Sequence, residues 1–497
     1  MTTPTRHVER EVKLSVAIGA DLPDLRQVVT RSVRQPEEHL TAVYFDTPDM
    51  RLWSRGITLR HRTGEGVPRW TLKLPQAGHG DALERVEFEW AGDDEQEMPA
   101  EIGDAVAGIV RRSPLRRIAE LRTERIHFQL EDDGVAWGDL VSDVVTVVGG
   151  PGDGRRFRQL ELEITADGAG VDKQAKGVVK ALRKSGAYLD PRPKVEAVFG
   201  PRPEDGPDLG PKSSAQQVIC QALASGLGRL LDHDCRIRLA GADVDPEDVH
   251  QQRVASRRLR SDLATLAPLL DPVWVGHVRR ELRQVGAVLG AVRDIDVLTD
   301  DLARAGAAED LIHRLERERA SAVCALREML TGSNYLDLLD RLHAASERPP
   351  IVDRKAAGRP ARRVVPPLVA GRWKKLRRDA AKGGKRPGDR QLHQIRKRSK
   401  QLRYASELAA PVAGKGARRT AKASKSVQSV LGDHHDAVVA VDWLSDVADG
   451  TATVSAASVR RLTERENRRK RELERRWRAP YQRLGRPAST RWLKVGH

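Results

Sequence analysis

The chain has 497 residues, too many for one ordinary hydrophobic core, and this length predicts two or three domains. Charged residues make up 32% of the chain and aromatic residues 4%. No run approaches the roughly 18 apolar residues of a membrane helix, which argues against a membrane protein. The first residues lack the apolar stretch of a signal peptide, and the three cysteines, Cys220, Cys235 and Cys324, have no metal-ligand spacing. We therefore expect a cytoplasmic protein with reduced thiols.

The net charge of +17 is unevenly distributed along the chain. Residues 1–200 carry 29 Lys and Arg against 33 Asp and Glu, whereas residues 201–497 carry 58 against 37. This excess of positive charge predicts a polyanionic partner for the second part. A solvated basic surface and a general affinity for nucleic acid are the alternatives.

Residues 5–199 are predicted to form mainly strands, because several segments alternate apolar and polar residues with a period of two. The clearest of these segments are 57–62, 70–74 and 84–90. Helical patterns interrupt them at 21–34, 99–113 and 172–186. The Pro- and Gly-rich stretch Gly200–Pro207 indicates a linker.

Charged residues recur at i, i+2 spacing on these strands, so each pair shares one face. Glu9, Glu11 and Lys13 are the first set; the others are Arg60/Arg62, Thr71/Lys73, Glu87/Glu89 and Glu161/Glu163, with Arg125 and Lys194 as single basic residues. One such pair is usually the wet face of a half-buried strand. The whole set instead favours a barrel with a charged interior. Paired carboxylates suit Mg²⁺ or Mn²⁺, and Arg and Lys bind phosphate oxygens.

The pattern Glu9-x-Glu11-x-Lys13 resembles the ExExK signature of the CYTH or triphosphate tunnel metalloenzyme family, and the later pairs follow in that family's order over about residues 5–199. The family includes thiamine triphosphatases, inorganic triphosphatases and class IV adenylate cyclases. The resemblance implies an eight-stranded antiparallel β-barrel tunnel and an Mg²⁺ or Mn²⁺ cofactor. The implied metal ligands are Glu9, Glu11, Glu161, Glu163, Glu87 and Glu89. The implied triphosphate ligands are Lys13, Arg60, Arg62, Lys73, Arg125 and Lys194. Catalytic roles are implied for Glu9, Glu11, Lys13 and Arg62, and further acidic candidates are Asp139 and Asp143.

After about residue 213 the pattern becomes helical, and the region is interrupted between about 348 and 367. The two resulting pieces indicate a duplication. His250-Gln251-Gln252-Arg253 matches His393-Gln394-Ile395-Arg396 at an offset of 143, and the Leu-Gly pairs at 289–290 and 431–432 match at an offset of 142. We therefore predict domains at 1–200 and 213–490, joined by a linker at 201–212, with the second domain in halves of about 213–348 and 366–490.

Each half carries one helix on which His, Arg and Lys fall within a single arc. Such an arc is usually just solvated, but its repetition at matched offsets favours a binding surface. These blocks resemble the CHAD domain, which implies two four-helix halves and the binding of inorganic polyphosphate. The implied polyphosphate ligands are His250, Arg253, Arg257, Arg260, His393, Arg396, Lys397, Lys400 and Arg403.

Two adjacent histidines, His434 and His435, lie between Asp433 and Asp436 and raise the question of a metal site. Adjacent residues of a helix point in different directions, so the sequence favours a structural salt-bridge or capping role.

The fold expected from the sequence is α+β: an N-terminal β-barrel tunnel with helices, then an all-α domain of two four-helix repeats. The first functional hypothesis is metal-dependent hydrolysis of tripolyphosphate or a related triphosphate, together with polyphosphate binding by the helical domain, in the cytoplasm and at polyphosphate granules. The second is a protein that binds polyphosphate without cleaving it. An adenylate cyclase and a nucleic-acid-binding protein are less favoured, because neither an adenine pocket nor a nucleic-acid motif is evident. The oligomeric state stays open.

Overall fold

A computed structural model of the chain describes residues 5–75, 83–149, 152–166, 168–202, 208–384, 386–450 and 455–494. The chain divides into two compact units, Met1–Glu204 and Asp205–His497. We call them the strand unit and the helical unit. Among the described residues, no helix has both the length and the apolar character that crossing a membrane requires.

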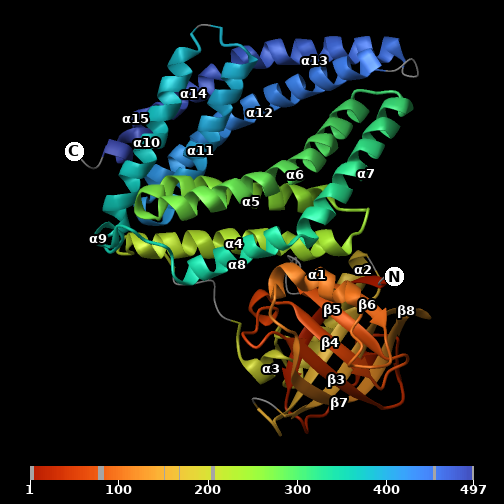
Figure 1. The fold of residues 1–497 in the computed structure, drawn as a ribbon. Coiled ribbons are helices and arrows are strands. Elements are labelled where there is room, and N and C mark those ends of the chain that lie inside the picture. Colours follow the sequence, from red (N-terminus) through yellow and green to blue (C-terminus); the bar gives the residue numbers. More distant parts are fainter. Residues whose placement is uncertain are drawn as a thin grey trace. The chain divides into compact units, whose positions relative to one another are not determined.

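The strand unit contains one antiparallel sheet with few helices (Figure 1). Its strands are β1 (Thr5–Val16), β2 (Arg31–Arg34), β3 (Glu38–Asp46), β4 (Thr58–Thr63), β5 (Arg69–Pro75), β6 (Leu83–Ala91), β7 (Arg116–Asp132), β8 (Val135–Val148), β9 (Arg156–Ile164) and β10 (Tyr188–Leu189). Its helices are α1 (Ala100–Val110), α2 (Ala169–Lys184) and α3 (Glu196–Phe199), with 3-10 turns at Leu25–Gln27 and Trp53–Arg55.

The strand order is β10-β1-β6-β5-β4-β3-β7-β8-β9, with β2 paired to β7. Strand β1 pairs with β6 and also with β9, so it connects the two ends of the series β6-β5-β4-β3-β7-β8-β9. The prediction of a β-rich domain with helices is therefore confirmed, although the described sheet has ten strands rather than eight.

The expected helix at 21–34 is wrong. This segment holds only the 3-10 turn Leu25–Gln27 and strand β2. Pro23 interrupts the pattern, and Val28, Val29 and Thr30 are β-branched residues that favour extended backbone over helix.

The apolar face of the sheet is covered by helix α2. Leu160 and Leu162 of β9 are fully buried and belong to the same hydrophobic cluster as Val178 and Leu182 of α2. Glu161 and Glu163 alternate with these leucines, so they lie on the opposite face of the strand. The charged residues of β9 consequently point into the sheet's interior.

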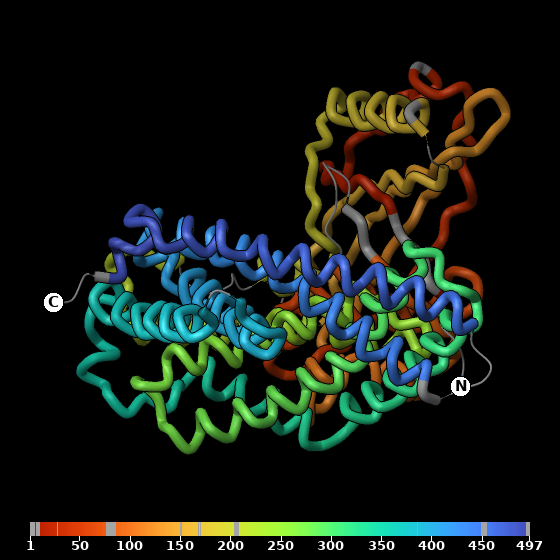
Figure 2. The backbone as a smooth tube through the Cα atoms, turned by 90° about the horizontal axis from the view of Figure 1, so that it is seen from above, coloured from red at the N-terminus to blue at the C-terminus, as the bar shows by residue number. Residues whose placement is uncertain are grey.

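The helical unit consists of long helices, among which the later pair α12 and α13 lie side by side (Figure 2). The long helices are α4 (Ala215–Leu239), α5 (Pro246–Leu266), α6 (Pro272–Arg304), α7 (Glu309–Thr331), α8 (Ser333–Glu347), α10 (Ala361–Lys382), α11 (Asp389–Ala413), α12 (Lys415–Gly450) and α13 (Ala456–Arg476). The shorter ones are α9 (Arg354–Ala357), α14 (Arg478–Leu484) and α15 (Pro487–Thr490), with 3-10 turns at Ala267–Leu269 and Arg491–Lys494.

Local sequence signals explain where several of these helices begin. Ser214 and Gln217 form a capping box at the start of α4. Asp245 and Asp271 cap α5 and α6, and each is followed by a proline in the first helical turn. These signals satisfy backbone N–H groups that would otherwise lack a partner.

The predicted duplication is visible in the order of the helices. Helix α5 packs between α4 and α6, and α11 packs between α10 and α12 in the same way. Helix α5 begins at Pro246 and α11 at Asp389, which reproduces the offset of 143 residues. The described part of the first half contains a fifth long helix, α8, packed on α4, so the half is larger than the four helices predicted.

Candidate functional site

The interior of the strand unit holds a cavity of about 250 Å³, which we call the charged cavity. Strand β1 contributes a lysine, β4 and β5 contribute arginines and a lysine, and β6 and β9 contribute glutamates. The lining residues are Lys13, Tyr44, Thr58, Arg60, Arg62, Glu65, Arg69, Lys73, Glu87, Glu89, Arg125, Glu161, Glu163, Pro193, Lys194 and Val195.

On one side of the charged cavity, two lysines converge on buried carboxylates. Lys13 Nζ lies 2.9 Å from Glu11 Oε2 and also contacts Glu161. Lys194 Nζ lies 2.9 Å from the other oxygen of Glu161 and 2.5 Å from Asp143 Oδ2. Cross-strand registry explains this grouping, because Lys13 stands opposite Glu161 and Glu11 opposite Glu163. Strand pairing thus brings the first and last predicted motifs together.

The arginines of the charged cavity share a carboxylate that the sequence reasoning missed. Arg62 Nη2 lies 2.9 Å from Glu65 Oε2, and Arg125 Nη1 lies 3.9 Å from the same atom. Glu65 lies in the turn after β4, between Gly64 and Gly66, which both have positive φ. A Cβ on Gly64 would come within 2.0 Å of the His39 carbonyl oxygen, so this turn requires glycine.

Electrostatics in the charged cavity follow from burial and from the number of cations. Burial lowers the pKa of Arg62 to about 10, and the neighbouring Arg60 adds to this shift. Burial alone would raise the pKa of Glu161, but Lys13, Lys194 and Arg125 together hold it well below its usual range. Arg62 and Glu161 therefore both stay charged near neutral pH.

The residues of this cavity fit a divalent metal ion. Glu11 is only 2% exposed, and its Oε1 has no hydrogen-bond partner among the described residues. Glu163 stands opposite Glu11 in the strand register. Glu11 lies outside the lining of the cavity and Glu163 within it, and two carboxylates on adjacent strands beside a basic cavity are donors of the kind that Mg²⁺ and Mn²⁺ use.

Most predicted residues of the strand unit meet at this cavity, but their roles differ in detail. Glu87 pairs with Lys73, and Glu89 Oε2 lies 3.5 Å from Arg69. Asp143 is fully buried beneath the lining and is bonded to Arg125 at 2.9 Å. Asp139 lies outside the lining and contacts His127 at 3.2 Å. The side chain of Glu9 lies outside the described residues.

The sequence reasoning also missed Tyr44, Thr58 and Arg69. A tyrosine or threonine on a strand gives no charge signal, and Arg69 begins β5 just outside the segment that alternates.

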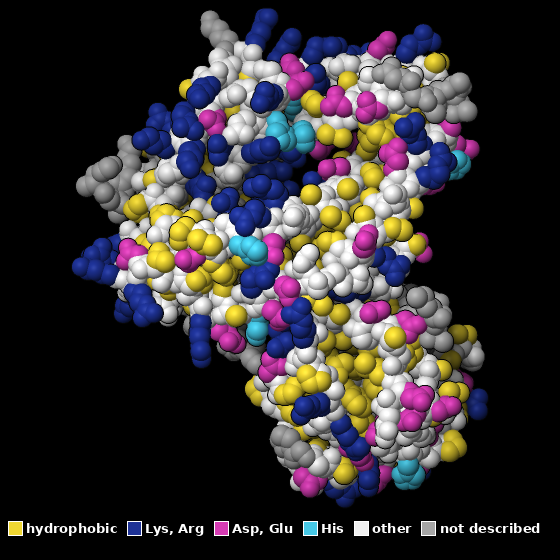
Figure 3. Space-filling model, in the orientation of Figure 1, with side chains coloured by type: hydrophobic (Ala, Val, Ile, Leu, Met, Phe, Trp, Pro, Cys, Tyr) yellow, Lys and Arg dark blue, Asp and Glu magenta, His cyan; other side chains and the backbone are white. Residues whose placement is uncertain are grey.

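The helical unit holds a second cavity, of about 240 Å³, between the repeated helix pairs α5–α6 and α11–α12. We call it the basic cavity. Figure 3 shows Lys, Arg and His side chains gathered around a hollow in this unit. Its polar lining residues are His250, Arg253, Arg257, Arg293, Asp294, Asp301, Arg396, Lys400, Gln428, His435 and Asp436.

Several basic side chains of the basic cavity lie half-buried and close to one another. Burial lowers the pKa of Lys400 to about 6, and Arg257 and Arg396 add to the effect. Burial also lowers the pKa of His435 to about 3 and of His393 to about 4, and the two imidazole rings lie 4.3 Å apart. These surroundings disfavour the protonated forms of Lys400, His435 and His393, and a bound anion would favour them.

Only part of the predicted polyphosphate set lines this cavity. His250, Arg253, Arg257, Arg396 and Lys400 line it. His393 contacts it through His435. Arg260, Lys397 and Arg403 lie outside the lining: Arg260 faces Arg283 and Arg279, and Arg403 donates to Glu407 at 2.8 Å.

Acidic residues moderate the charge of the basic cavity. Arg253 donates to Asp294 at 2.8 Å, and Asp301 accepts from Arg469 at 3.1 Å. Lys400 has no ion-pair partner within the described ranges. Arg293 and His435 also line the cavity, although the sequence did not assign them to polyphosphate and favoured a structural role for His435.

Comparisons with known proteins agree with this division. A family model described as CYTH domain matches residues 7–188, and one described as CHAD domain matches residues 221–445. Two uncharacterized proteins of Mycobacterium tuberculosis, MT2285 and Rv2226, are each 30% identical over 480 residues, covering 89% of this chain and 89% of the relative.

Solved structures with similar parts include the CHAD domain of the plant Ricinus communis, with 23% identity and a TM-score of 0.48 over 56% of this chain and 94% of that one. Another is a Hippeastrum protein, HpAC1, studied as an adenylyl cyclase and described with a dominant triphosphatase activity. It has 17% identity and a TM-score of 0.25 over 38% of this chain and 95% of that one.

Proposed function

This chain belongs to the family of proteins that carry an N-terminal CYTH domain and a C-terminal CHAD domain, and we propose on that premise that its charged cavity hydrolyses inorganic tripolyphosphate or a related triphosphate. We further propose that the basic cavity binds inorganic polyphosphate. The first proposal is carried by one observation: seven Arg and Lys side chains among the described residues line a cavity that also holds the buried carboxylates of Glu87 and Glu161.

The cations of the charged cavity suit a short chain of phosphates. Arg60, Arg62 and Arg125 offer planar forks that bind phosphate oxygens through paired hydrogen bonds, and Lys13 and Lys194 add point charges. Carboxylates such as Glu65 now hold these cations in place. A triphosphate entering the cavity would replace some of these ion pairs with its own.

A divalent ion held by Glu11 and Glu163 would neutralise phosphate charge and polarise the bond under attack. The remaining chemistry belongs to side chains of this chain. Lys13, held between Glu11 and Glu161, keeps its ammonium aimed at the cavity, and Arg62 stabilises negative charge that develops on the departing phosphate. No nucleophilic side chain is needed, because water attacks.

Polyphosphate binding is supported by the half-buried, closely spaced basic side chains of the basic cavity. Lys400 has its pKa lowered to about 6 by burial and by Arg257 and Arg396. A polyanion placed among these groups would relieve their mutual repulsion. Both halves of the duplication contribute, with Arg253 and Arg257 from α5 and Arg396 and Lys400 from α11.

A substrate panel tests the first proposal. Purified full-length protein is incubated with tripolyphosphate, thiamine triphosphate, ATP or long polyphosphate, each with Mg²⁺ and with Mn²⁺, and the products are measured. We expect phosphate release from tripolyphosphate and its loss in Glu11→Gln. Formation of cyclic AMP from ATP without phosphate release would instead favour a cyclase, and no turnover with either metal would leave polyphosphate binding as the function.

A binding assay tests the second proposal. We expect Arg257→Ser combined with Arg396→Ser to weaken binding of long polyphosphate, measured by fluorescence with a labelled chain at fixed salt. Binding that is competed equally well by DNA would point to a general polyanion surface. Unchanged affinity in the double variant would place polyphosphate elsewhere.

A further inference from the structure

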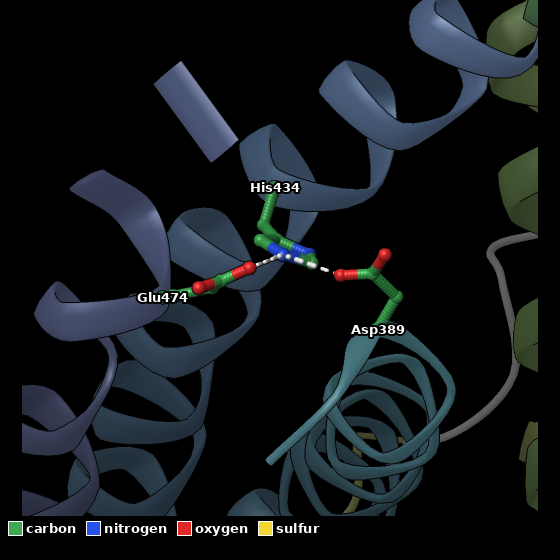
Figure 4. A group of neighbouring side chains, drawn as sticks. All are labelled: Asp389, His434 and Glu474. Atoms are coloured by element: carbon green, nitrogen blue, oxygen red, sulfur yellow. Dashed lines mark ion pairs between the residues drawn. The ribbon is translucent and has the colours of Figure 1, made fainter. Parts of the chain in front are cut away.

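Three polar side chains of the helical unit meet outside the basic cavity. Asp389 begins α11, His434 lies in α12, and Glu474 lies near the end of α13. Figure 4 shows both carboxylates pointing toward the imidazole of His434. Their ligand atoms all lie within 4.8 Å of one another.

The histidine of this group is buried and poorly satisfied. His434 is 2% exposed, and its Nε2 has no hydrogen-bond partner among the described residues. That nitrogen lies 3.3 Å from Asp389 Oδ1 and 3.7 Å from Glu474 Oε1. Both distances exceed those of a good N–H···O hydrogen bond, so the nitrogen lies at ion-pair distance from two carboxylates without a close hydrogen bond to either. A buried polar atom left in this way calls for a partner.

The spacing matches the donor atoms of a tetrahedral metal centre. An ion bound at about 2.1 Å by imidazole nitrogen and carboxylate oxygens keeps its ligand atoms roughly 3.4 Å apart. The two measured separations, 3.3 and 3.7 Å, lie on either side of this value. The side chains of Asp389 and Glu474 are 39% and 35% exposed, so an ion can reach the group and water can complete its coordination.

We propose that Asp389, His434 and Glu474 bind one divalent ion of the zinc type, which joins helices α11, α12 and α13. Imidazole is a good ligand for Zn²⁺ and a poor one for Mg²⁺, so this site differs in selectivity from the all-carboxylate set of the charged cavity. Lys470 Nζ lies 3.0 Å from Asp389 Oδ2 and orients that carboxylate as an outer partner.

The site has a consequence for the basic cavity. His435 follows His434 directly and lines the basic cavity, whereas His434 points to Asp389 and Glu474. An ion bound by His434 would hold in place the turn of α12 that carries His435, and would thereby position His435 in the basic cavity. Glu474 lies beyond residues 221–445, the range matched by the CHAD model, so the site combines that domain with the helix that follows it.

Zinc titration of the metal-free full-length protein tests this proposal, with Mg²⁺ in excess to occupy the carboxylates of the charged cavity. We expect one equivalent of Zn²⁺ to bind by calorimetry and to raise the unfolding temperature of the helical unit. Glu474→Gln should weaken this binding by more than about 10-fold, because even the loss of an outer partner costs that much. Glu472→Gln is the matched control, because Glu472 lies on the same helix and, among the described residues, forms an ion pair with Arg476 alone.

Two further readouts keep the result decisive. Co²⁺ in place of Zn²⁺ should give the intense visible absorption of a tetrahedral site in the wild type and in Glu472→Gln, but not in His434→Ala. Glu474→Gln changes a partly exposed side chain, so its fold can be checked by circular dichroism even where His434→Ala destabilises the protein. The proposal is overturned when a folded Glu474→Gln binds the same number of zinc ions with the same affinity as the wild type, which would leave an ion pair only.

Discussion

At the scale of single residues, burial decides what each charged side chain does. Glu161 is 4% exposed yet remains ionised, since Lys13, Lys194 and Arg125 surround it. Lys400 lies half-buried beside Arg257 and Arg396, and its pKa falls to about 6. The first environment holds opposite charges together, whereas the second gathers like charges and so prepares a place for an anion.

A substitution of Arg62 tests our proposal that the charged cavity binds phosphate groups. Its guanidinium forms a planar fork that lysine lacks, so Arg62→Lys keeps the charge but loses the paired hydrogen bonds. We expect kcat/KM for tripolyphosphate to fall roughly 10- to 150-fold, which corresponds to a loss of about 1.5–3 kcal/mol of transition-state stabilisation. Steady-state phosphate release measures this change, and Arg183→Ala, an exposed arginine of α2, is the control. Equal rates for Arg62→Lys and the wild type would remove Arg62 from the site.

Lys400 gives a pH-dependent prediction for the basic cavity. Its pKa in the folded, ligand-free protein is about 6, below its ordinary value of 10.5, so the unfolded chain holds more protons between these values. Its contribution to stability therefore rises with pH across that window. Polyphosphate favours the charged ammonium, so binding at pH 8 should take up protons, as measured by calorimetry in buffers of different ionisation enthalpy. Lys400→Met should abolish most of this uptake; an unchanged uptake would contradict the account.

At the scale of elements, alternation along each strand separates the chemistry from the core. Leu160 and Leu162 of β9 pack against α2. Glu161 and Glu163, which alternate with these leucines, face the charged cavity on the other side of the strand. Helices α5 and α11 work in a comparable way in the helical unit. Each buries one apolar side, through Leu259 and Leu402, and turns its arginines toward the basic cavity.

Helix α2 covers the apolar face of the sheet. Truncating one of its buried side chains should therefore lower the stability of the strand unit and leave the residues of the charged cavity unchanged. Leu182 of α2 is fully buried, so Leu182→Ala should lower the free energy of unfolding of the strand unit by about 2–5 kcal/mol. Urea denaturation followed by tryptophan fluorescence measures this difference. Lys180→Ala, on the exposed side of the same helix, should change it by less than about 0.5 kcal/mol. Similar values for both variants would show that α2 does not cover the sheet as described.

The sequence was sufficient where chemistry and periodicity coincide. Glu161 and Glu163 alternate with leucines, and their direction into the interior follows from that alternation. The fixed offset between His250 and His393 likewise predicted the repeated helices.

Features that depend on tertiary contacts were missed. Glu65 lies in a glycine turn with no strand period, and only the fold brings it to Arg62 and Arg125. Glu474 is 40 residues from His434 along the chain, so only the packing of α12 against α13 brings the two together. The segment 21–34 carries a helical spacing of apolar residues that its β-branched residues override.

At the scale of the whole molecule, the described residues form two cavities lined by Arg and Lys, and the two differ in character. The charged cavity contains cations and carboxylates in close pairs, which suits a metal-bound triphosphate. The basic cavity contains cations in excess over carboxylates, which suits a longer polyanion. We therefore propose that the strand unit cleaves triphosphate and that the helical unit binds the longer polyanion.

Phosphate release from tripolyphosphate is the measurement that tests this account most directly. Full-length wild type, Arg62→Ala and Arg183→Ala are compared with Mg²⁺, with Mn²⁺ and with a chelator. We predict release by the wild type and by Arg183→Ala with a divalent ion, none with the chelator, and a loss of activity in Arg62→Ala, because the charged cavity supplies the phosphate ligands. Release that continues in the chelator or in Arg62→Ala, or no release by the wild type with either metal, would contradict the assignment of cleavage to this cavity.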